Sequence, residues 1–315
     1  MEFGVHLPLI SLQGEQRTLA DLTAFTSAAT SLGYTTLCAN DHLVFARPWL
    51  DGPTALAAVL EHSGSMQLMT TVALPVVRGP AATAKTLGAI DLLSGGRLTV
   101  GVGPGSSARD YELAGVAFEE RWKRLDDAVE VLRAFWGGED HDGPYYRATG
   151  FRLEPLPRRE SVPARAGPPI WIGSWGSPAG LRHVARLADG WLASGYNTTP
   201  EAFGKAWADL GELLLQRGRD PASFPNAIAT MWTYVTEDAV EADRVLREVL
   251  APMLNRPVEE LRAKLPVGTP EECVAKLAAY ARAGAQQVFL WPVQDEVEQL
   301  RRFRTEVWPQ LLEVT

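Results

Sequence analysis

The chain has 315 residues, of which 46% are apolar and 22% charged, and its formal net charge is −8. This composition is typical of a folded globular protein and excludes a disordered, collagen-like or low-complexity chain. The length suits either two ordinary domains or one large barrel of alternating strands and helices. Because an acidic protein repels polyanions, we expect no nucleic acid among its partners.

The N-terminus, the apolar runs and the cysteine spacing indicate where the protein is located and which sites it lacks. The N-terminus lacks the charged and apolar regions of a signal peptide, and no apolar run reaches the roughly 18 residues of a membrane span. The two cysteines, Cys38 and Cys273, lie too far apart for a metal-binding or redox motif. We therefore expect a cytoplasmic protein with two buried free thiols and no membrane contact.

Short apolar runs alternate with segments of helical periodicity along the chain. Eight runs are candidate strands: residues 3–7, 35–39, 68–74, 98–102, 170–173, 191–194, 227–235 and 287–291. Strands that alternate with helices predict a parallel sheet with right-handed crossovers. With eight units, the simplest closed form is one α/β domain over residues 1–315, a (β/α)8 TIM barrel with insertions.

Helix boundaries and two irregular segments complete the predicted architecture. Ser177, Thr199 and Thr269 each precede a proline, which is the pattern of an N-cap followed by the first helical residue. Glu272 adds a capping box to Thr269. The proline-rich residues 137–168 predict a surface excursion with a small hairpin, and residues 252–268 predict a polar stretch before the last unit.

In such a barrel the active site lies at the C-terminal ends of the strands. Asn40-Asp41-His42 follows the second strand, where a carboxylate can orient an imidazole beside a ligand. In the structural alternative, Asp41 caps the next helix and His42 only packs. We expect no metal on His6, Asp41 and His42, because the sequence has no His-x-His, HExxH or dense acidic set.

Two Gly- and Ser-rich turns follow the fourth and fifth strands. Residues 101–107 and 173–177 each lead from a strand into a helix, where free N–H groups can hold a phosphate. The first contains G-x-G-x-G, which matches neither the dinucleotide nor the Walker fingerprint, so a tight turn without a ligand is the alternative. Because the overall charge is negative, an anionic ligand would depend on such N–H groups and on residues such as Arg78.

Bulky side chains near the predicted strand ends indicate a pocket for a planar, apolar ring. The candidates for the substrate pocket are His6, Trp49, Trp175, Tyr196, Trp232 and Trp291. Packing in the core is the alternative for Trp232.

Several motifs together resemble the bacterial luciferase-like superfamily of monooxygenases and F-420-dependent oxidoreductases. They are Phe3-Gly-Val-His-Leu-Pro8, Leu32-Gly-Tyr34, Asp41-His42, Leu93-Ser-Gly-Gly-Arg97, Val100-Gly-Val-Gly-Pro-Gly105, Phe118-Glu-Glu-Arg-Trp122, Ala188-Asp-Gly-Trp191 and Val267-Gly-Thr-Pro-Glu271. The match extends from about residue 3 to residue 309. This resemblance implies a (β/α)8 barrel that binds FMN or the deazaflavin coenzyme F-420 (F420).

The resemblance also implies roles for particular residues. The ring would lie across the barrel mouth, with its phosphate on the two turns, at Gly103, Gly105, Ser106, Ser107, Gly176 and Ser177. In F420-dependent members the Asp41–His42 pair would contact the cofactor, and a non-prolyl cis peptide would fall near Thr71 and Val72. The sugar-phosphate dehydrogenases of the family have a Glu where this chain has Ser106, so we do not expect glucose 6-phosphate as the substrate.

The sequence thus favours hydride transfer between F420 and a small, fairly apolar substrate. His42 would move the accompanying proton or polarise the substrate, and Asp41 would orient its ring. One alternative is an FMN-dependent monooxygenase that receives reduced flavin from a separate reductase. Another is a barrel that binds a flavin-type ring without turnover. Family members are commonly dimers, and the Ala-rich helices near residues 54–64 and 80–94 favour a homodimer.

Overall fold

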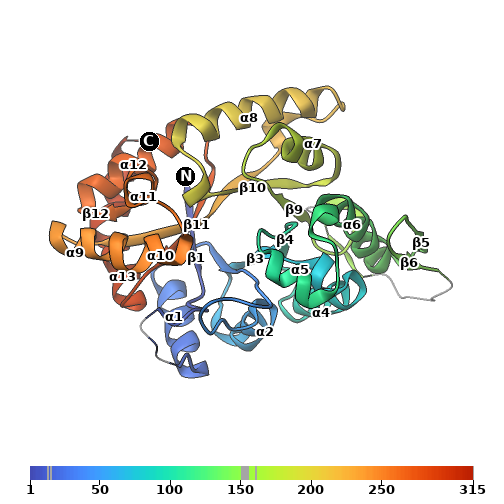
Figure 1. The fold of residues 1–315 in the computed structure, drawn as a ribbon, viewed down its shortest axis with the longest axis horizontal. Coiled ribbons are helices and arrows are strands. Elements are labelled where there is room, and N and C mark those ends of the chain that lie inside the picture. The colour runs from blue at the N-terminus through green and yellow to red at the C-terminus, as the bar shows by residue number, and fades with distance from the viewer. Residues whose placement is uncertain (13, 15, 150–155, 160–161, 315) are drawn as a thin grey trace.

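Eight parallel strands form a closed barrel in the computed structural model, which describes residues 1–12, 14, 16–149, 156–159 and 162–314 (Figure 1). In chain order they are β1 (Glu2–His6), β2 (Thr36–Ala39), β3 (Gln67–Ala73), β4 (Leu98–Val102), β9 (Ile170–Gly173), β10 (Gly190–Ser194), β11 (Asn226–Val235) and β13 (Gln287–Pro292). Each strand pairs with the next, and β13 closes the barrel onto β1. The predicted (β/α)8 barrel and all eight of its strands are confirmed.

Helices surround the barrel and bury their apolar sides against it (Figure 1). The α-helices are α1 (Leu19–Ser31), α2 (Gly52–Ala58), α3 (Pro75–Arg78), α4 (Pro80–Leu93), α5 (Ala108–Ala114), α6 (Arg121–Gly137), α7 (Pro178–Leu187), α8 (Pro200–Leu215), α9 (Ala239–Arg244), α10 (Ala251–Leu254), α11 (Val258–Lys264), α12 (Pro270–Arg282), α13 (Glu296–Arg302) and α14 (Trp308–Val314). Short 3-10 segments are η1 (Leu60–His62), η2 (Phe118–Glu120), η3 (Gly195–Asn197) and η4 (Pro221–Ser223), and π-helical turns are η5 (Val245–Leu250) and η6 (Phe303–Val307). In the described residues, none of the helices is both long and apolar enough to cross a membrane.

The three helix starts predicted from Ser/Thr-Pro pairs are confirmed. The hydroxyls of Ser177, Thr199 and Thr269 accept the N–H groups at the starts of α7, α8 and α12. In return, the Glu272 carboxylate accepts the Thr269 backbone N–H at 3.0 Å. Each such cap stabilises a helix by about 1 kcal/mol because it satisfies a backbone donor that the helix leaves free. Cys38 and Cys273 are buried and free, as expected.

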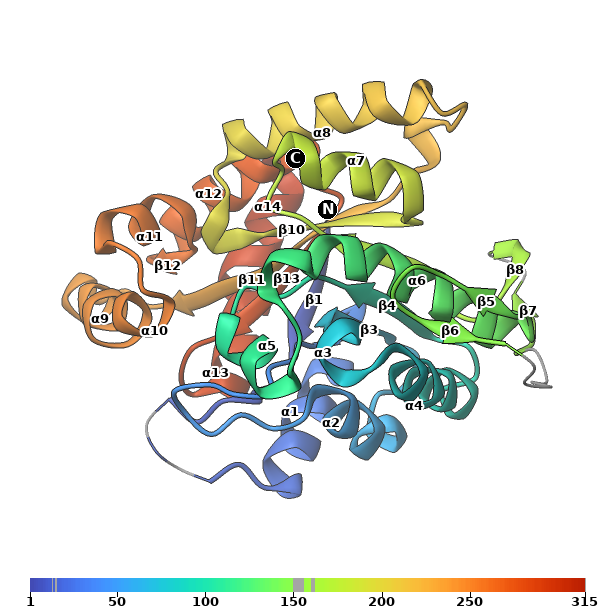
Figure 2. The same cartoon turned by 45° about the vertical axis from the view of Figure 1, so that its right-hand side comes forward.

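Residues 137–168 and 252–268, the two segments that interrupt the predicted alternation, both contain short secondary-structure elements. Residues 137–168 contain the short hairpin β5 (His141–Asp142) with β6 (Arg147–Ala148) and the pair β7 (Arg158–Arg159) with β8 (Val162–Ala166), beside α6 (Figure 2). Residues 150–155, 160 and 161 of this excursion lie outside the described residues. The polar stretch at 252–268 precedes the last unit, and it forms α11 and β12 (Val267–Gly268), with Leu261 and Leu265 buried.

Two strands are irregular where they approach the mouth of the barrel. The register of β3 shifts between Thr70 and Ala73, where the Thr71–Val72 peptide bond is cis, as the family resemblance implies. The register of β11 shifts between Ile228 and Met231, and Thr230 between them has a φ of 54°. Both irregularities therefore fall at the end of the barrel where the site was expected.

Candidate functional site

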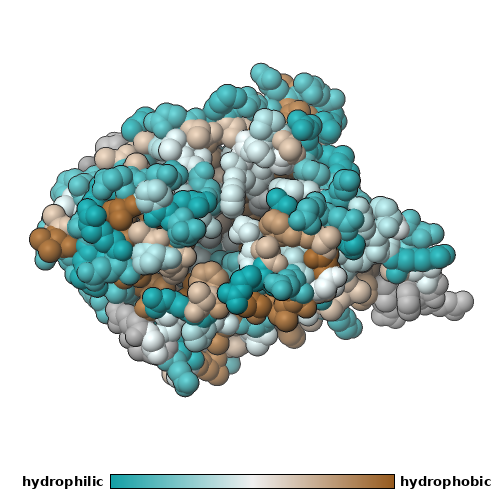
Figure 3. All heavy atoms as spheres, viewed as in Figure 1, coloured by the Kyte–Doolittle hydropathy of each residue, from teal (hydrophilic) through white to brown (hydrophobic). Residues whose placement is uncertain are grey.

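A cavity of about 500 Å³ opens among the C-terminal ends of the strands. Figure 3 shows a hollow between the α5 side and the α10 side of the molecule. Ten of the predicted site residues lie on the cavity wall: Asp41, His42, Thr71, Val72, Gly103, Gly105, Ser106, Trp175, Ser177 and Tyr196. The structure therefore brings residues from the β2, β3, β4, β9 and β10 ends together around one space.

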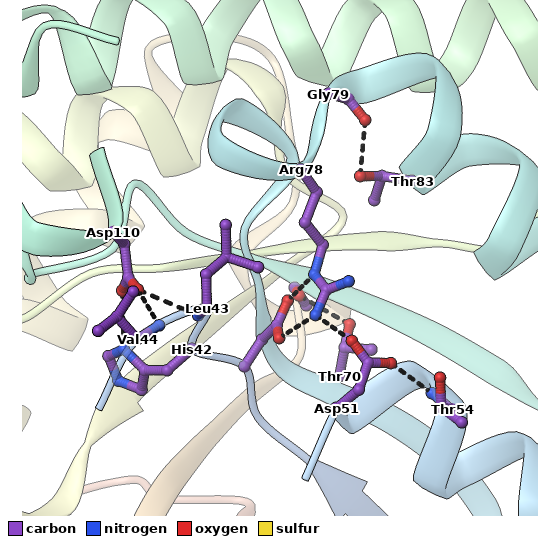
Figure 4. A network of polar contacts seen from close by, with 12 residues as sticks. His42, Leu43, Val44, Asp51, Thr54, Thr70, Arg78, Gly79, Thr83 and Asp110 are labelled. Carbon is purple, nitrogen blue, oxygen red and sulfur yellow. Dashed lines mark hydrogen bonds and ion pairs between the residues drawn. The ribbon is translucent and has the colours of Figure 1, made fainter. Parts of the chain in front are cut away.

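His42 is held by a carboxylate from another element. Its Nδ1 lies 2.8 Å from Oδ2 of Asp110 on α5, and Asp110 Oδ1 accepts the N–H groups of Leu43 at 3.0 Å and Val44 at 2.8 Å (Figure 4). Because an ionised carboxylate can only accept, Nδ1 carries the proton and donates it. The other ring nitrogen, Nε2, has no partner among the described residues, and His42 itself lines the cavity.

Asp110 is buried, with a side-chain exposure of 1%. Burial by itself raises the pKa of this carboxyl, but the hydrogen bonds from His42 and from the Val44 and Leu43 N–H groups hold its pKa below the ordinary value. Asp110 is therefore an anion that fixes both the His42 ring and the backbone that follows it.

The expectation that Asp41 orients His42 was wrong. Asp41 forms an ion pair with Arg78, whose Nη2 lies 2.6 Å from Asp41 Oδ1 and also contacts Asp51. Figure 4 shows Arg78 with Asp51 on one side and His42 with Asp110 on the other. Consecutive residues in extended chain point to opposite sides, so adjacency in the sequence does not bring Asp41 to the ring. Asp41 is no cap of α2 either, because Asp51 accepts the Thr54 N–H there.

Arg78 is placed differently from the prediction. It is absent from the cavity wall, and it contacts two carboxylates, Asp41 and Asp51. Burial alone would lower the pKa of Arg78, but the hydrogen bonds that it donates to Asp41 and Asp51 raise this pKa above its ordinary value. This guanidinium therefore ties the loop before α2 to α3, and its charge is already matched.

The Gly-rich turns make room for a side chain as well as for a ligand. A Cβ atom at Gly103 would lie 2.7 Å from Val72 Cγ2, and one at Gly173 would lie 2.8 Å from Val72 Cγ1. Real Cβ atoms do not approach so closely, so glycine at both positions lets Val72 project between β4 and β9. Ser107 and Gly176, which belong to the same turns, are not on the cavity wall.

The predicted aromatic lining is only partly correct. His6, Trp232 and Trp291 are absent from the cavity wall and form a buried stack, with Trp291 4.5 Å from His6 and 4.1 Å from Trp232 between ring centroids. Trp49 packs against the His42 ring at 4.9 Å instead of facing the cavity. His6, Trp232 and Trp291 are buried because they lie on barrel strands, whose inward-facing residues fill the interior. Packing, the alternative for Trp232, is confirmed.

Three residues of the cavity wall do not follow a barrel strand, so a search of the strand ends could not find them. Phe118, Arg121 and Trp122 belong to η2 and the start of α6 and line the cavity. They stand inside one of the resemblance motifs, which was the available signal. Among the described residues Arg121 has no carboxylate partner, and its side chain donates to the Phe118 carbonyl at 3.0 Å. Its charge is thus available to an anion.

The wall suits a flat ring with a polar edge and an anionic chain. Asn40 lines the cavity, and its buried Oδ1 has no hydrogen-bond partner in the described structure, so it can accept from a ring N–H. Ser106, Ser177 and Arg121 provide donors for an anionic group. The residues present therefore fit a flavin or deazaflavin cofactor.

Comparison with known proteins supports the same assignment. A model of the family described as luciferase-like monooxygenase matches residues 1–256. F420-dependent hydroxymycolic acid dehydrogenase of Mycobacterium tuberculosis is 27% identical, over 96% of this chain and 87% of that protein. F420-dependent glucose-6-phosphate dehydrogenase of Nocardia farcinica is 28% identical, over 86% of this chain and 84% of that protein.

Solved structures share the fold. An F420-dependent secondary alcohol dehydrogenase in complex with an F420-acetone adduct has a TM-score of 0.79 and 20% identity, over 98% of both chains. The oxygenating constituent of 3,6-diketocamphane monooxygenase from Pseudomonas putida, in complex with FMN, has a TM-score of 0.73 and 17% identity, over 99% of both chains. At these sequence identities the similarity shows a shared barrel fold.

Proposed function

Because this chain belongs to the luciferase-like monooxygenase family, we propose that it transfers a hydride between F420 and a small, fairly apolar substrate. Two relatives that match most of the chain are F420-dependent dehydrogenases. The single observation that carries the chemical part of the proposal is the His42–Asp110 pair on the cavity wall.

The side chains around the cavity have separate tasks in this proposal. When bound, F420 supplies a ring carbon that gives or takes a hydride. Thr71 and Val72 would lie against the ring, while Gly103, Gly105, Ser106 and Ser177 would bind the phosphate through N–H and hydroxyl groups. Leu74, Trp122 and Trp175 supply an apolar wall for the substrate.

His42 would handle the proton of the reaction. When an alcohol loses a hydride from carbon, its hydroxyl proton must also leave, and Nε2 of His42 is free to accept it. Asp110 holds the protonated Nδ1 and stabilises the positive charge that the ring then carries. In the reverse direction the same nitrogen returns the proton to the carbonyl oxygen.

Cofactor binding followed by turnover tests the proposal. The protein is titrated without oxygen with F420 and with FMN, and the loaded protein is then mixed with secondary alcohols and with glucose 6-phosphate. We expect micromolar binding of F420 and its reduction by alcohols. Binding of FMN alone, with oxygen-dependent turnover once a reductase supplies reduced flavin, would establish the monooxygenase alternative that the FMN-bound neighbour favours. F420 binding without turnover would leave only a binding barrel.

We also propose a homodimer that uses the end of α4. Leu92 and Leu93 are 52% and 74% exposed, and burial of such apolar surface is worth about 25 cal/mol per Å². Light scattering at micromolar concentration should give twice the mass of the chain, and Leu93→Glu should shift the protein to monomer. A monomeric mass for the unmodified protein contradicts the proposal.

A further inference from the structure

His6 is a buried histidine that the mechanism above does not use. It ends β1 beneath the cavity and is 1% exposed. Its Nε2 accepts the N–H of Thr230 at 3.0 Å, its Nδ1 lies 3.4 Å from Thr71 Oγ1, and its ring stacks on Trp291 with an interplanar angle of 8°. His6 thus contacts β3 and β11, which lie two strands away from β1 on either side.

These contacts define the state of the ring. A backbone N–H can only donate, so Nε2 must be unprotonated and the proton of the neutral ring stands on Nδ1, toward the Thr71 hydroxyl. No acidic side chain in the described ranges pairs with His6. Burial lowers the pKa of His6 to about 3, which agrees with a ring that stays neutral.

Thr230 needs such a partner because its backbone is unusual. Its φ of 54° lies in the left-handed region, which a β-branched residue adopts only where the surroundings impose it. Two hydrogen bonds hold it there, the N–H to His6 and Oγ1 to Ser194 Oγ at 3.1 Å. Thr230 and Thr71 both line the cavity, whereas His6 does not.

We propose that His6 is a positioning residue of this cavity. By tying the irregular turn of β11 at Thr230 to Thr71 on β3, its neutral ring sets the spacing of two walls between which a flat ligand lies. The inference rests on the proposed function only through the choice of F420 as the probe, because the spacing concerns any flavin-type ring.

Three substitutions separate the contacts of His6. His6→Phe keeps a ring that can stack on Trp291 and removes both hydrogen bonds. His6→Gln offers an amide oxygen as acceptor for the Thr230 N–H. Thr230→Gly adopts positive φ without a Cβ penalty, so its turn no longer depends on His6. His141→Phe is the matched control, since His141 also has a close partner, Asp127 at 2.7 Å, but lies on the β5 hairpin away from the cavity.

The main readout is the dissociation constant for F420, measured from the change in its absorption and fluorescence on binding. We expect binding about tenfold weaker for His6→Phe, a difference of about 1.4 kcal/mol. Binding should be within about threefold of the unmodified protein for His6→Gln and for His141→Phe. In the Thr230→Gly background, His6→Phe should weaken binding by clearly less than in the unmodified protein, because the two residues act as a unit.

A ligand-free measurement makes the test independent of the cofactor. In ¹⁵N NMR, the His6 signal, identified by its loss in His6→Gln, should show a protonated Nδ1 and no titration between about pH 5 and pH 8. If His6→Phe does not fold, His6→Gln and the NMR signal decide. The proposal is overturned if His6 titrates in this range, or if folded His6→Phe binds as tightly as the control. If the protein binds FMN and not F420, the proposed function fails, but the same order of variants is expected with FMN.

Discussion

His42 and His6 belong to neighbouring strand ends of one barrel, yet their surroundings are opposite. His42 follows β2, keeps 19% of its side chain exposed and donates from Nδ1 to a buried carboxylate. His6 ends β1, is buried, and accepts a backbone N–H. A ring with a carboxylate behind it and a cavity before it can exchange protons, whereas protonation of His6 at Nε2 would break its bond to Thr230. The partner atom, more than the residue type, decides the role.

Of the substitutions that test this difference between His42 and His6, replacement of His42 should have the largest effect. His42→Ala removes the group that moves the proton, so the rate of hydride transfer should fall by about 10²–10⁴-fold. F420 affinity should stay within about threefold, because the phosphate turns are untouched. Single-turnover stopped-flow mixing measures the rate, and a rate close to that of the unmodified protein would falsify the role of His42.

Asp110→Asn should give the next largest effect. The amide can still accept the Leu43 and Val44 N–H groups, but it cannot stabilise a positively charged His42 ring, so we expect the single-turnover rate to fall by about 10- to 100-fold, less than for removal of His42 itself. Asp41→Asn is the matched comparison. It weakens the ion pair with Arg78 and should lower the free energy of unfolding by about 1–3 kcal/mol while costing less rate. Equal rate losses in the two variants would remove the distinction between Asp110 and Asp41.

The pH dependence of the free energy of unfolding tests whether His6 is neutral in the folded protein. The pKa of His6 is lowered from 6.5 to about 3 in the folded protein. Between these two pH values, His6 is therefore protonated in the unfolded chain and neutral in the folded chain. The stability from His6 is therefore complete above pH 6.5 and is lost as the pH falls toward 3, by about 2 kcal/mol at about pH 5. Urea unfolding near pH 7 and pH 5 should show a smaller loss for His6→Phe, and identical losses would exclude a neutral His6.

The smallest expected effect on stability is that of replacing Trp175. Trp175 is 54% exposed on the cavity rim, so Trp175→Ala should change the free energy of unfolding by no more than about 0.5 kcal/mol. It should nevertheless raise KM for apolar substrates, because a contact surface is lost. Trp232→Ala, within the buried stack, should cost about 3–5 kcal/mol of stability. Thermal unfolding and steady-state kinetics distinguish the two, and a large stability loss for Trp175→Ala would place it in the core.

The sequence could predict those site residues that directly follow a barrel strand. His42, Ser106 and Tyr196 follow strands that periodicity finds, and all three line the cavity. Asp110 could not be chosen, because it stands in the first turn of α5, where an acidic residue is ordinarily explained by the helix terminus. Its contact with His42 depends on how α5 folds back over the β2 loop.

By itself the sequence determined the eight strands, the helix starts at Ser177, Thr199 and Thr269, and the end of the barrel that carries the site. These follow from local periodicity and capping, which act within a few residues. Tertiary structure alone decided which carboxylate meets His42 and which aromatic rings face the cavity. Such choices depend on the directions of side chains from strands and helices distant in the chain, and burial of those side chains then sets whether a histidine takes a proton or stays neutral.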